Sequence, residues 1–244
     1  VSDRLMQLPL GIFAIAIGTV ILPRLASLHS SDNQLEFSKT LDWSLRLILL
    51  IGTPAALGLV ALSEPIIMTL FERGEFGELD TQKTSMSLIA LAVGLLAFML
   101  IKVLTPGFFA RQQPKKPVII ALISMIINGF LAWLLGFYLG LNHVGLALAS
   151  SLSAFFTVFA LLFYLKKENI YNAEKGWFLF LIRLLIACLL LYLCIDFFNQ
   201  EISTWRSMKG VSRFLNLAIL IGFGMLAYLS TLWTLGLRQN DFKH

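Results

Sequence analysis

Long apolar stretches separated by short polar ones are the dominant pattern of the sequence. A helix that crosses a lipid bilayer needs about 20 mostly apolar residues, and seven stretches are long enough. None of them alternates apolar and polar positions, as the strands of a membrane barrel do. The pattern therefore predicts an all-α polytopic membrane protein with seven transmembrane helices, at about residues 5–25, 41–62, 85–110, 118–138, 144–165, 177–198 and 214–237.

Prolines and one short apolar segment modify the predicted helices. Pro9, Pro54 and Pro106 lie inside them, where a proline removes a backbone donor and favours a kink. Neighbouring helices in a membrane satisfy the freed carbonyl, so each kink is either a hinge or a static bend. The apolar segment Pro65–Phe71 is too short to span, and we expect it to extend the preceding helix or to lie at the membrane interface.

The composition excludes a soluble globular domain. Hydrophobic residues make up 58% of the 244 residues, charged residues only 14%, and the mean hydropathy is +0.82. A soluble domain carries about 25% charged residues. The net charge of +5 comes from basic residues in the loops between apolar stretches, which indicates membrane topology rather than nucleic-acid binding.

The basic residues are unevenly distributed among the loops. The loops after the first, third and fifth predicted helices are basic, whereas the loop after the second is acidic and the others are neutral or mixed. Because basic loops remain on the cytoplasmic side, we expect these three loops and the C-terminus in the cytoplasm and the N-terminus outside. The basic loop residues are Arg24, Lys39, Arg111, Lys115, Lys116, Lys166, Lys167 and Lys175.

Enzyme motifs are missing from the sequence, which contains no HExxH, CxxC, P-loop or GxSxG pattern. His29, His143 and His244 are scattered over loops and the terminus, and Cys188 and Cys194 lie six residues apart in one apolar stretch. We therefore expect no catalytic residue, no metal site, no cofactor and no ATP-driven pump in this chain.

Polar residues at the start of the first helix form the most informative cluster. Arg4, Gln7 and Gly11 share one helix face through their spacing of three and seven residues, and Asp3 lies beside them. A guanidinium binds phosphate oxygens with two hydrogen bonds and cannot lose its charge, so this face is a candidate anion site. The alternative is an interfacial Asp–Arg pair in which the arginine side chain extends to the water.

Lys102 is a second charge within a predicted helix. It lies before Arg111, roughly 13 Å from the cytoplasmic helix end at 1.5 Å per residue. Its side chain either extends to that surface or lines a cavity with Thr105 and Gly94. Arg46 lies nearer a helix end, and we expect its side chain to extend to the surface.

Three motifs in the first 120 residues resemble a known family. The sequence SDRLMQLPLG at 2–11, continuing to VILP at 20–23, is similar to an ADRL…LPxG…LP helix. LFERGEF at 70–76 is similar to LFxRGxF. KVL at 102–104, with FFARQ at 108–112 and PV at 117–118, is similar to KVL…FYARQDxxxPV. Together with their spacing, these motifs resemble those of the MurJ (MviN) family of lipid II flippases.

The resemblance implies that the chain is one lobe of a two-lobe exporter. That family has fourteen transmembrane helices and belongs to the multidrug/oligosaccharidyl-lipid/polysaccharide exporter superfamily. The chain, which begins with Val1 and not Met, then corresponds to the C-terminal lobe, helices eight to fourteen. The family moves lipid II, the undecaprenyl-diphosphate-linked peptidoglycan precursor, across the bacterial inner membrane by alternating access. Its groove for the lipid tail corresponds to 177–198 and 214–237.

The resemblance also assigns candidate substrate-binding residues. The arginine of the ADRL motif lines the family's central cavity, and it matches Arg4. This implies that Arg4 holds the diphosphate, with Asp3, Gln7 and Lys102 as further candidates. Gln7 stands where some members carry an acid, which weakens any acid–arginine switch within this helix.

The implied partners are lipid II, the N-terminal lobe of the same protein and membrane lipids, with no nucleic acid. Two other functions remain open, namely a flippase for another polyprenyl-diphosphate-linked saccharide and a non-transporting membrane scaffold. A drug antiporter is disfavoured, because it would depend on acidic cavity residues and the predicted helices contain almost none.

Overall fold

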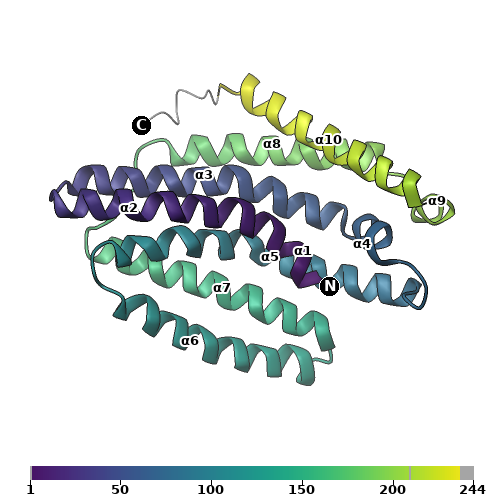
Figure 1. The fold of residues 1–244 in the computed structure, drawn as a ribbon, viewed down its shortest axis with the longest axis horizontal. Helices are drawn as coiled ribbons and strands as arrows, with labels where there is room; N and C mark the ends of the chain where they lie inside the picture. The colour runs from purple at the N-terminus through teal and green to yellow at the C-terminus, as the bar shows by residue number, and fades with distance from the viewer. Residues whose placement is uncertain (1, 209, 237–244) are drawn as a thin grey trace. The chain divides into compact units, whose positions relative to one another are not determined.

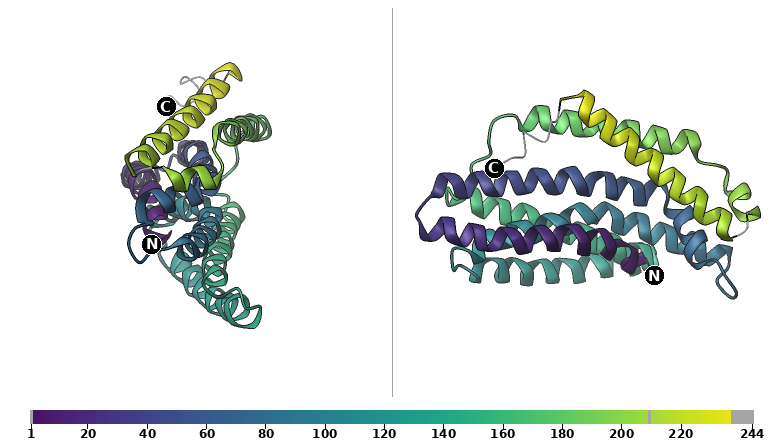
Figure 2. Two further views of the ribbon diagram at one scale, coloured as in Figure 1. Left: turned by 90° about the vertical axis from the view of Figure 1, so that its right-hand side faces the viewer. Right: turned by 45° about the horizontal axis from the view of Figure 1, so that its top comes forward.

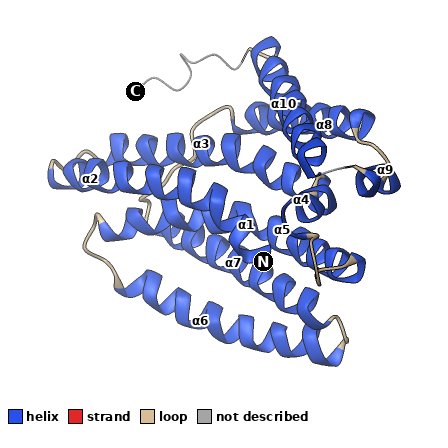
Figure 3. Cartoon of the chain, turned by 45° about the vertical axis from the view of Figure 1, so that its right-hand side comes forward, coloured by secondary structure: helices blue, strands red, loops and turns tan. Residues whose placement is uncertain are grey.

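The computed structural model describes residues 2–208 and 210–236, and these residues form helices joined by short loops, with no strand (Figures 1 and 3). Two of the helices are short π-helices, η1 and η2. The elements are α1 (Ser2–Pro9), η1 (Leu10–Ile15), α2 (Ala16–Ser30), α3 (Gln34–Ala61), α4 (Ser63–Phe71), α5 (Glu78–Phe109), α6 (Lys115–Ala132), η2 (Trp133–Tyr138), α7 (Asn142–Lys167), α8 (Trp177–Phe198), α9 (Ile202–Ser207) and α10 (Gly210–Thr234).

Seven helices are long and apolar enough to cross a membrane, with α1–η1–α2 and α6–η2 each counted as one. This confirms the all-α class and the predicted number of spans. Most of the helices begin before the predicted ranges, with α3 beginning at Gln34 and α5 at Glu78, whereas α8 matches its range and α10 ends at Thr234. The prediction counted apolar residues only, whereas polar turns continue a helix past the hydrocarbon layer. The predicted end of the last span, residue 237, lies outside the described residues.

The short apolar segment Pro65–Phe71 belongs to a separate helix, α4. The chain breaks at Leu62, which has φ −108° and ψ 17°, and α4 begins at Ser63. Most of its residues are buried, and it contacts α9 and α10. The expectation that the segment extends α3 is therefore wrong, because α4 is a separate helix, whereas a position at the membrane interface stays a prediction.

The chain divides into two compact units. The first comprises Val1–Gly52 and Ala90–Lys175, and the second comprises Thr53–Ile89 and Gly176–His244. The first unit thus contains α1, η1, α2, α6, η2, α7 and parts of α3 and α5. The second contains α4, α8, α9, α10 and the remaining parts of α3 and α5.

Small and hydroxyl-bearing residues hold the first unit together, in which α6 and α7 lie side by side (Figure 2). Ser151 on α7 donates a hydrogen bond to the carbonyl oxygen of Ala90 on α5 at 2.7 Å. A Cβ atom on Gly94 would lie 2.4 Å from the Ser151 Oγ, so this glycine permits the close approach of α5 and α7. Thr157 donates to Ser124 of α6 at 2.8 Å. Such packing stabilises helices in lipid, where no hydrophobic driving force brings them together.

In the second unit, α8 and α10 run antiparallel and pack along each other (Figure 1). A Cβ atom on Gly224 would lie 3.1 Å from the side chain of Ile195, so the glycine allows a close contact. The connecting helix α9 buries Trp205, whose indole N–H donates to the Asn199 Oδ1 at 3.1 Å. Aromatic side chains such as Phe178 remain exposed on the outer surface of this pair, as expected for helices that face lipid.

The loops of each unit are joined by hydrogen bonds and ion pairs. In the first unit, the Gln34 amide at the start of α3 donates to the carbonyl of Asn169 in the fifth loop at 2.8 Å. Lys116 at the start of α6 pairs with Glu168. The three basic loops therefore lie at one end of this unit. In the second unit, Arg206 of the sixth loop pairs with Glu78 beside the acidic second loop at 2.5 Å.

Candidate functional site

The predicted face at the start of the first helix is open. Arg4, Gln7 and Gly11 are all exposed, whereas Leu5 and Met6 on the other side of the helix are buried. No atom lies within 4 Å of the position that a Cβ on Gly11 would take. The structure therefore places a cation, an amide and an open glycine next to one another on a single exposed surface.

Gln7 organises the carboxylate beside Arg4. Its Nε2 donates a hydrogen bond of 3.0 Å to the Asp3 Oδ2, one helical turn earlier. Arg4 forms no ion pair within 4.0 Å in the described part of the chain. The guanidinium is thus exposed with its donors free for a ligand, while the amide holds the neighbouring carboxylate in place.

A π-helix follows this face directly. Pro9 ends α1, and η1 carries the chain through the next six residues into α2. Prolines and π-turns are the usual causes of helix bends, and the first turns deviate from the axis of α2 (Figure 1). The predicted kink at Pro9 is present, whereas Pro54 and Pro106 lie within the continuous helices α3 and α5.

Lys102 is exposed on α5 but lies away from Arg4. Its carbonyl oxygen would be 3.1 Å from a Cβ on Gly18, which places it beside the first turn of α2, near the middle of the first span. Gly18 follows Arg4 by fourteen residues, or about 21 Å along a helix. Of the two alternatives for Lys102, a cavity shared with Gly94 does not form, because Gly94 is buried against Ser151.

A buried carboxylate that the sequence reasoning missed lies in α3. Asp42 is 1% exposed and accepts hydrogen bonds from the Arg46 Nε at 2.8 Å and from the Tyr171 hydroxyl at 2.7 Å. Arg46 also donates to the carbonyl of Lys175 at 3.3 Å. Arg46, which we expected to extend to the surface, is partly buried and forms an ion pair with Asp42. The spacing of four residues was the signal that could have predicted this pair.

Asp42 belongs to a row of polar residues along α3, spaced four residues apart, that we call the α3 stripe. Its members are Gln34, Ser38, Asp42 and Arg46. Each member bonds to the segment 169–175 that connects α7 to α8. Ser38 contributes a pair of bonds, because its hydroxyl donates to the Asn172 carbonyl at 3.1 Å and accepts from the Asn172 N–H at 2.9 Å. The stripe therefore holds this connection against α3 and has a structural role.

A cluster of charges in the second unit also has a structural role. Arg213 at the start of α10 lies 3.5 Å from Glu72, and Arg206 of α9 pairs with Glu78 at 2.5 Å and lies 3.9 Å from Glu64. These pairs join α9 and α10 to α4 and the beginning of α5. The acids around the second loop are therefore used to hold this unit together.

Residues suited to metal binding do not gather in the described ranges, where no group of three or more His, Cys, Asp or Glu side chains is found. Cys188 and Cys194 are free thiols within α8. The exposed face at Arg4 offers a cation to an anionic ligand.

Comparison with known sequences identifies the relationship. Residues 1–215 match the model of the family described as "Lipid II flippase MurJ". The chain is 42% identical over 99% of its length to a probable lipid II flippase MurJ of Vibrio cholerae, and 39% identical over 98% to one of Haemophilus influenzae. It covers 46% and 48% of these two relatives, so it spans about half of their length.

A solved structure agrees with the sequence matches. It is described as "Lipid II flippase MurJ, inward closed conformation" and superposes with a TM-score of 0.75 at 27% identity, over 94% of this chain and 44% of the solved chain. The family match extends through α1 to the start of α10 and includes Arg4 and Lys102. On these grounds, the chain belongs to the MurJ family of lipid II flippases.

Proposed function

We propose that the chain is the C-terminal lobe of a flippase that moves lipid II from the inner to the outer leaflet of the bacterial inner membrane. Three findings support this proposal, namely membership of the family, a length of about half that of the relatives, and seven helices able to span a membrane. The observation that carries it is the exposed Arg4 on an open helix face.

In this proposal Arg4 binds the diphosphate of the lipid head group. Its guanidinium offers two parallel N–H donors to phosphate oxygens and keeps its charge at any cellular pH. Asp3 would repel the diphosphate if it turned toward it. The hydrogen bond from Gln7 to Asp3 restrains the carboxylate and leaves Arg4 as the dominant charge. Arginines contributed by the N-terminal lobe of the flippase complete the site.

Lys102 acts at a different stage in this proposal. It is exposed about 21 Å along the helix axis from Arg4, in the direction of the basic loops. The head group therefore meets Lys102 on entering from the cytoplasmic side and Arg4 deeper in the path. The bend at Pro9 and η1 lets the face at Arg4 tilt when the two lobes rock between their inward-open and outward-open states.

The lipid tail stays in the membrane, along α8 and α10. Both helices expose large apolar side chains, and Phe198 of α8 stacks with Phe223 of α10 at 5.2 Å between ring centroids. With the basic loops in the cytoplasm, the N-terminus of the chain lies on the periplasmic side and the C-terminus in the cytoplasm. Alternating access forms and breaks no covalent bond, so the protein is a transporter and not an enzyme, and it needs no cofactor.

Complementation tests this function in cells that are depleted of their own lipid II flippase. The full-length protein carrying Arg4→Ala should fail to restore growth, because a lost charged contact lowers diphosphate binding roughly ten- to hundredfold. Arg24→Ala is the matched control, since Arg24 is an exposed arginine nearer the other end of the same span. It should restore growth as the wild type does.

The possible results separate the functions. Growth with both variants would refute the role of Arg4 while keeping the flippase. Failure of the wild type, at normal abundance in the membrane, would refute lipid II as the substrate. A flippase for another polyprenyl-diphosphate-linked saccharide would then remain, because Arg4 would meet the same diphosphate. A non-transporting scaffold would show no transport of either lipid.

A further inference from the structure

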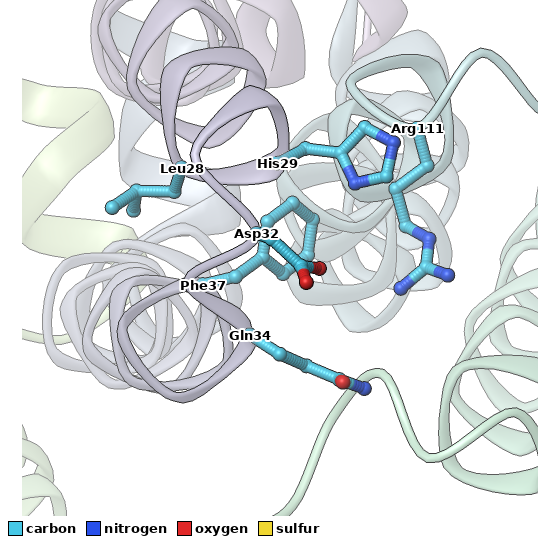
Figure 4. Close-up of a pocket in the computed structure, with 6 residues that line it drawn as sticks. All are labelled: Leu28, His29, Asp32, Gln34, Phe37 and Arg111. Atoms are coloured by element: carbon cyan, nitrogen blue, oxygen red, sulfur yellow. The ribbon is translucent and has the colours of Figure 1, made fainter.

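A second polar pocket lies at the opposite end of the first unit from Arg4. It is a cavity of about 70 Å³ between the end of α2, the start of α3 and the end of α5. This is several times the roughly 10–15 Å³ that one water molecule requires. The residues that line it are Leu28, His29, Asp32, Gln34, Phe37 and Arg111 (Figure 4).

Opposite charges share this pocket without neutralising each other. Arg111 and Asp32 form no ion pair within 4.0 Å, and the Arg111 Nε is buried and has no hydrogen-bond partner in the described part of the chain. Figure 4 shows the Asp32 carboxylate pointing toward the part of the pocket that holds Arg111, with the His29 imidazole on the same side as Arg111. An unpartnered buried donor is costly, and a bound acceptor would satisfy it.

Gln34 contributes less to recognition, because its amide already donates to the carbonyl of Asn169 at 2.8 Å. The groups left for a ligand are the guanidinium of Arg111, the imidazole of His29 and the carboxylate of Asp32. They offer donors to an anionic group and an acceptor to a cationic one. A free phosphate or a purely anionic head group would bring its charge close to Asp32, which opposes it.

The position of the pocket points to a lipid. It lies where three apolar helices end, which is the depth of the polar head groups in a bilayer, and beside the basic loops. Exposed apolar side chains lie close by in the sequence, with Leu35 at 67% exposure and Phe109 at 43%. The buried ring of Phe37 forms an apolar wall of the pocket.

We propose that this pocket binds the phosphoethanolamine head group of a zwitterionic membrane phospholipid. The phosphate accepts hydrogen bonds from Arg111 and His29, and the primary ammonium donates to Asp32. The acyl chains remain in the bilayer and contact Leu35 and Phe109. The bound lipid stabilises the contact between the first and third loops at the cytoplasmic end.

Native mass spectrometry of the purified full-length protein tests this site, with dioleoyl phosphatidylethanolamine and dioleoyl phosphatidylglycerol added separately. The wild type should retain the ethanolamine lipid in preference to the glycerol lipid. Arg111→Gln should lower retention of the ethanolamine lipid about tenfold, through loss of a charged hydrogen bond. Lys115→Gln removes the same charge from an exposed neighbouring position and should change nothing.

Asp32→Asn makes the test specific for a zwitterion. It should lower retention of the ethanolamine lipid about tenfold and leave or raise that of the glycerol lipid, since the repulsion of anions is removed. Equal retention of the ethanolamine lipid by wild type and Asp32→Asn would overturn the proposal. A wild type without preference for that lipid would also overturn it, as expected if a segment of the N-terminal lobe fills the pocket. Asp32 lies in an exposed loop, so this variant keeps the test valid if Arg111→Gln does not fold.

Discussion

At the residue scale, Arg4 and Arg46 carry the same guanidinium in apolar helices but have different surroundings. Arg46 has an acid one turn earlier, on its own side of the helix, and its Nε donates to Asp42 at 2.8 Å. Arg4 has an acid directly before it in sequence, and adjacent helical positions do not face each other. Gln7 engages that acid instead. Arg46 is therefore structural, whereas Arg4 is available to a ligand.

Replacement of Asp42 by alanine should be strongly destabilising. The substitution leaves Arg46 and the Tyr171 hydroxyl without their common acceptor, and breaking a buried ion pair costs about 3 kcal/mol or more. Glu36→Ala is the matched control, because Glu36 pairs with Lys39 near the surface and such a pair contributes about 0–1 kcal/mol. Thermal unfolding of the full-length protein in detergent measures both. Equal melting temperatures for the two variants would contradict the role assigned to Asp42.

At the element scale, the contact between α5 and α7 depends on a glycine, Gly94, which has no side chain. A Cβ on Gly94 would lie 2.4 Å from the Ser151 Oγ and 2.8 Å from the Ser151 Cα, closer than real Cβ contacts allow. The hydrogen bond from Ser151 to the carbonyl of Ala90 requires the same close approach. The two helices cannot accept a side chain here without moving apart.

Gly94→Ala should therefore destabilise the protein by about 1–3 kcal/mol, the usual cost of forcing extra volume into a packed interior. Gly129→Ala should be neutral or stabilising by up to about 1 kcal/mol, because no atom lies within 4 Å of that Cβ position and alanine favours the helix. Unfolding in denaturant compares the two. Adding Ser151→Gly should recover part of the loss in Gly94→Ala, and the absence of any recovery would argue against a steric cause.

At the scale of the whole molecule, alternate loops meet within the units. The first, third and fifth loops lie together at one end of the first unit, through Lys116 with Glu168 and Gln34 with Asn169. The second and sixth loops are joined in the second unit by Arg206 and Glu78. Consecutive spans cross the membrane in opposite directions, so odd-numbered loops must lie on one side and even-numbered loops on the other, as observed within each unit. The positive charge of the basic loops predicts that they lie in the cytoplasm.

Cysteine labelling in intact cells measures that orientation. In full-length protein with Cys188 and Cys194 replaced by alanine, Glu75→Cys in the second loop should react with a membrane-impermeant maleimide added outside. Lys167→Cys at the end of α7 should react only after the cells are permeabilised. The opposite pattern would show that the orientation is reversed. The lipid head group would then meet Arg4 before Lys102 on its way from the cytoplasm.

The sequence alone predicted the all-α class and the seven spans because the length of an apolar run is a local property. It did not predict that α4 is a separate helix, because Pro65–Phe71 is apolar enough for either arrangement considered. For the candidate site, it predicted that Arg4, Gln7 and Gly11 share a face. The sequence could predict this because the three residues are neighbours within two turns of one helix. The structure shows that the face is exposed.

The sequence by itself thus determined the fold class and the number of spans, because hydropathy is a property of each residue and its neighbours in the chain. Tertiary structure decided which distant residues meet. It buried Asp42 against Tyr171, set Gly94 against Ser151 and placed Lys102 beside Gly18, away from Arg4. The physical reason is that these contacts depend on how helices far apart in the chain pack, and hydrophobic periodicity carries no information about which partner a helix selects.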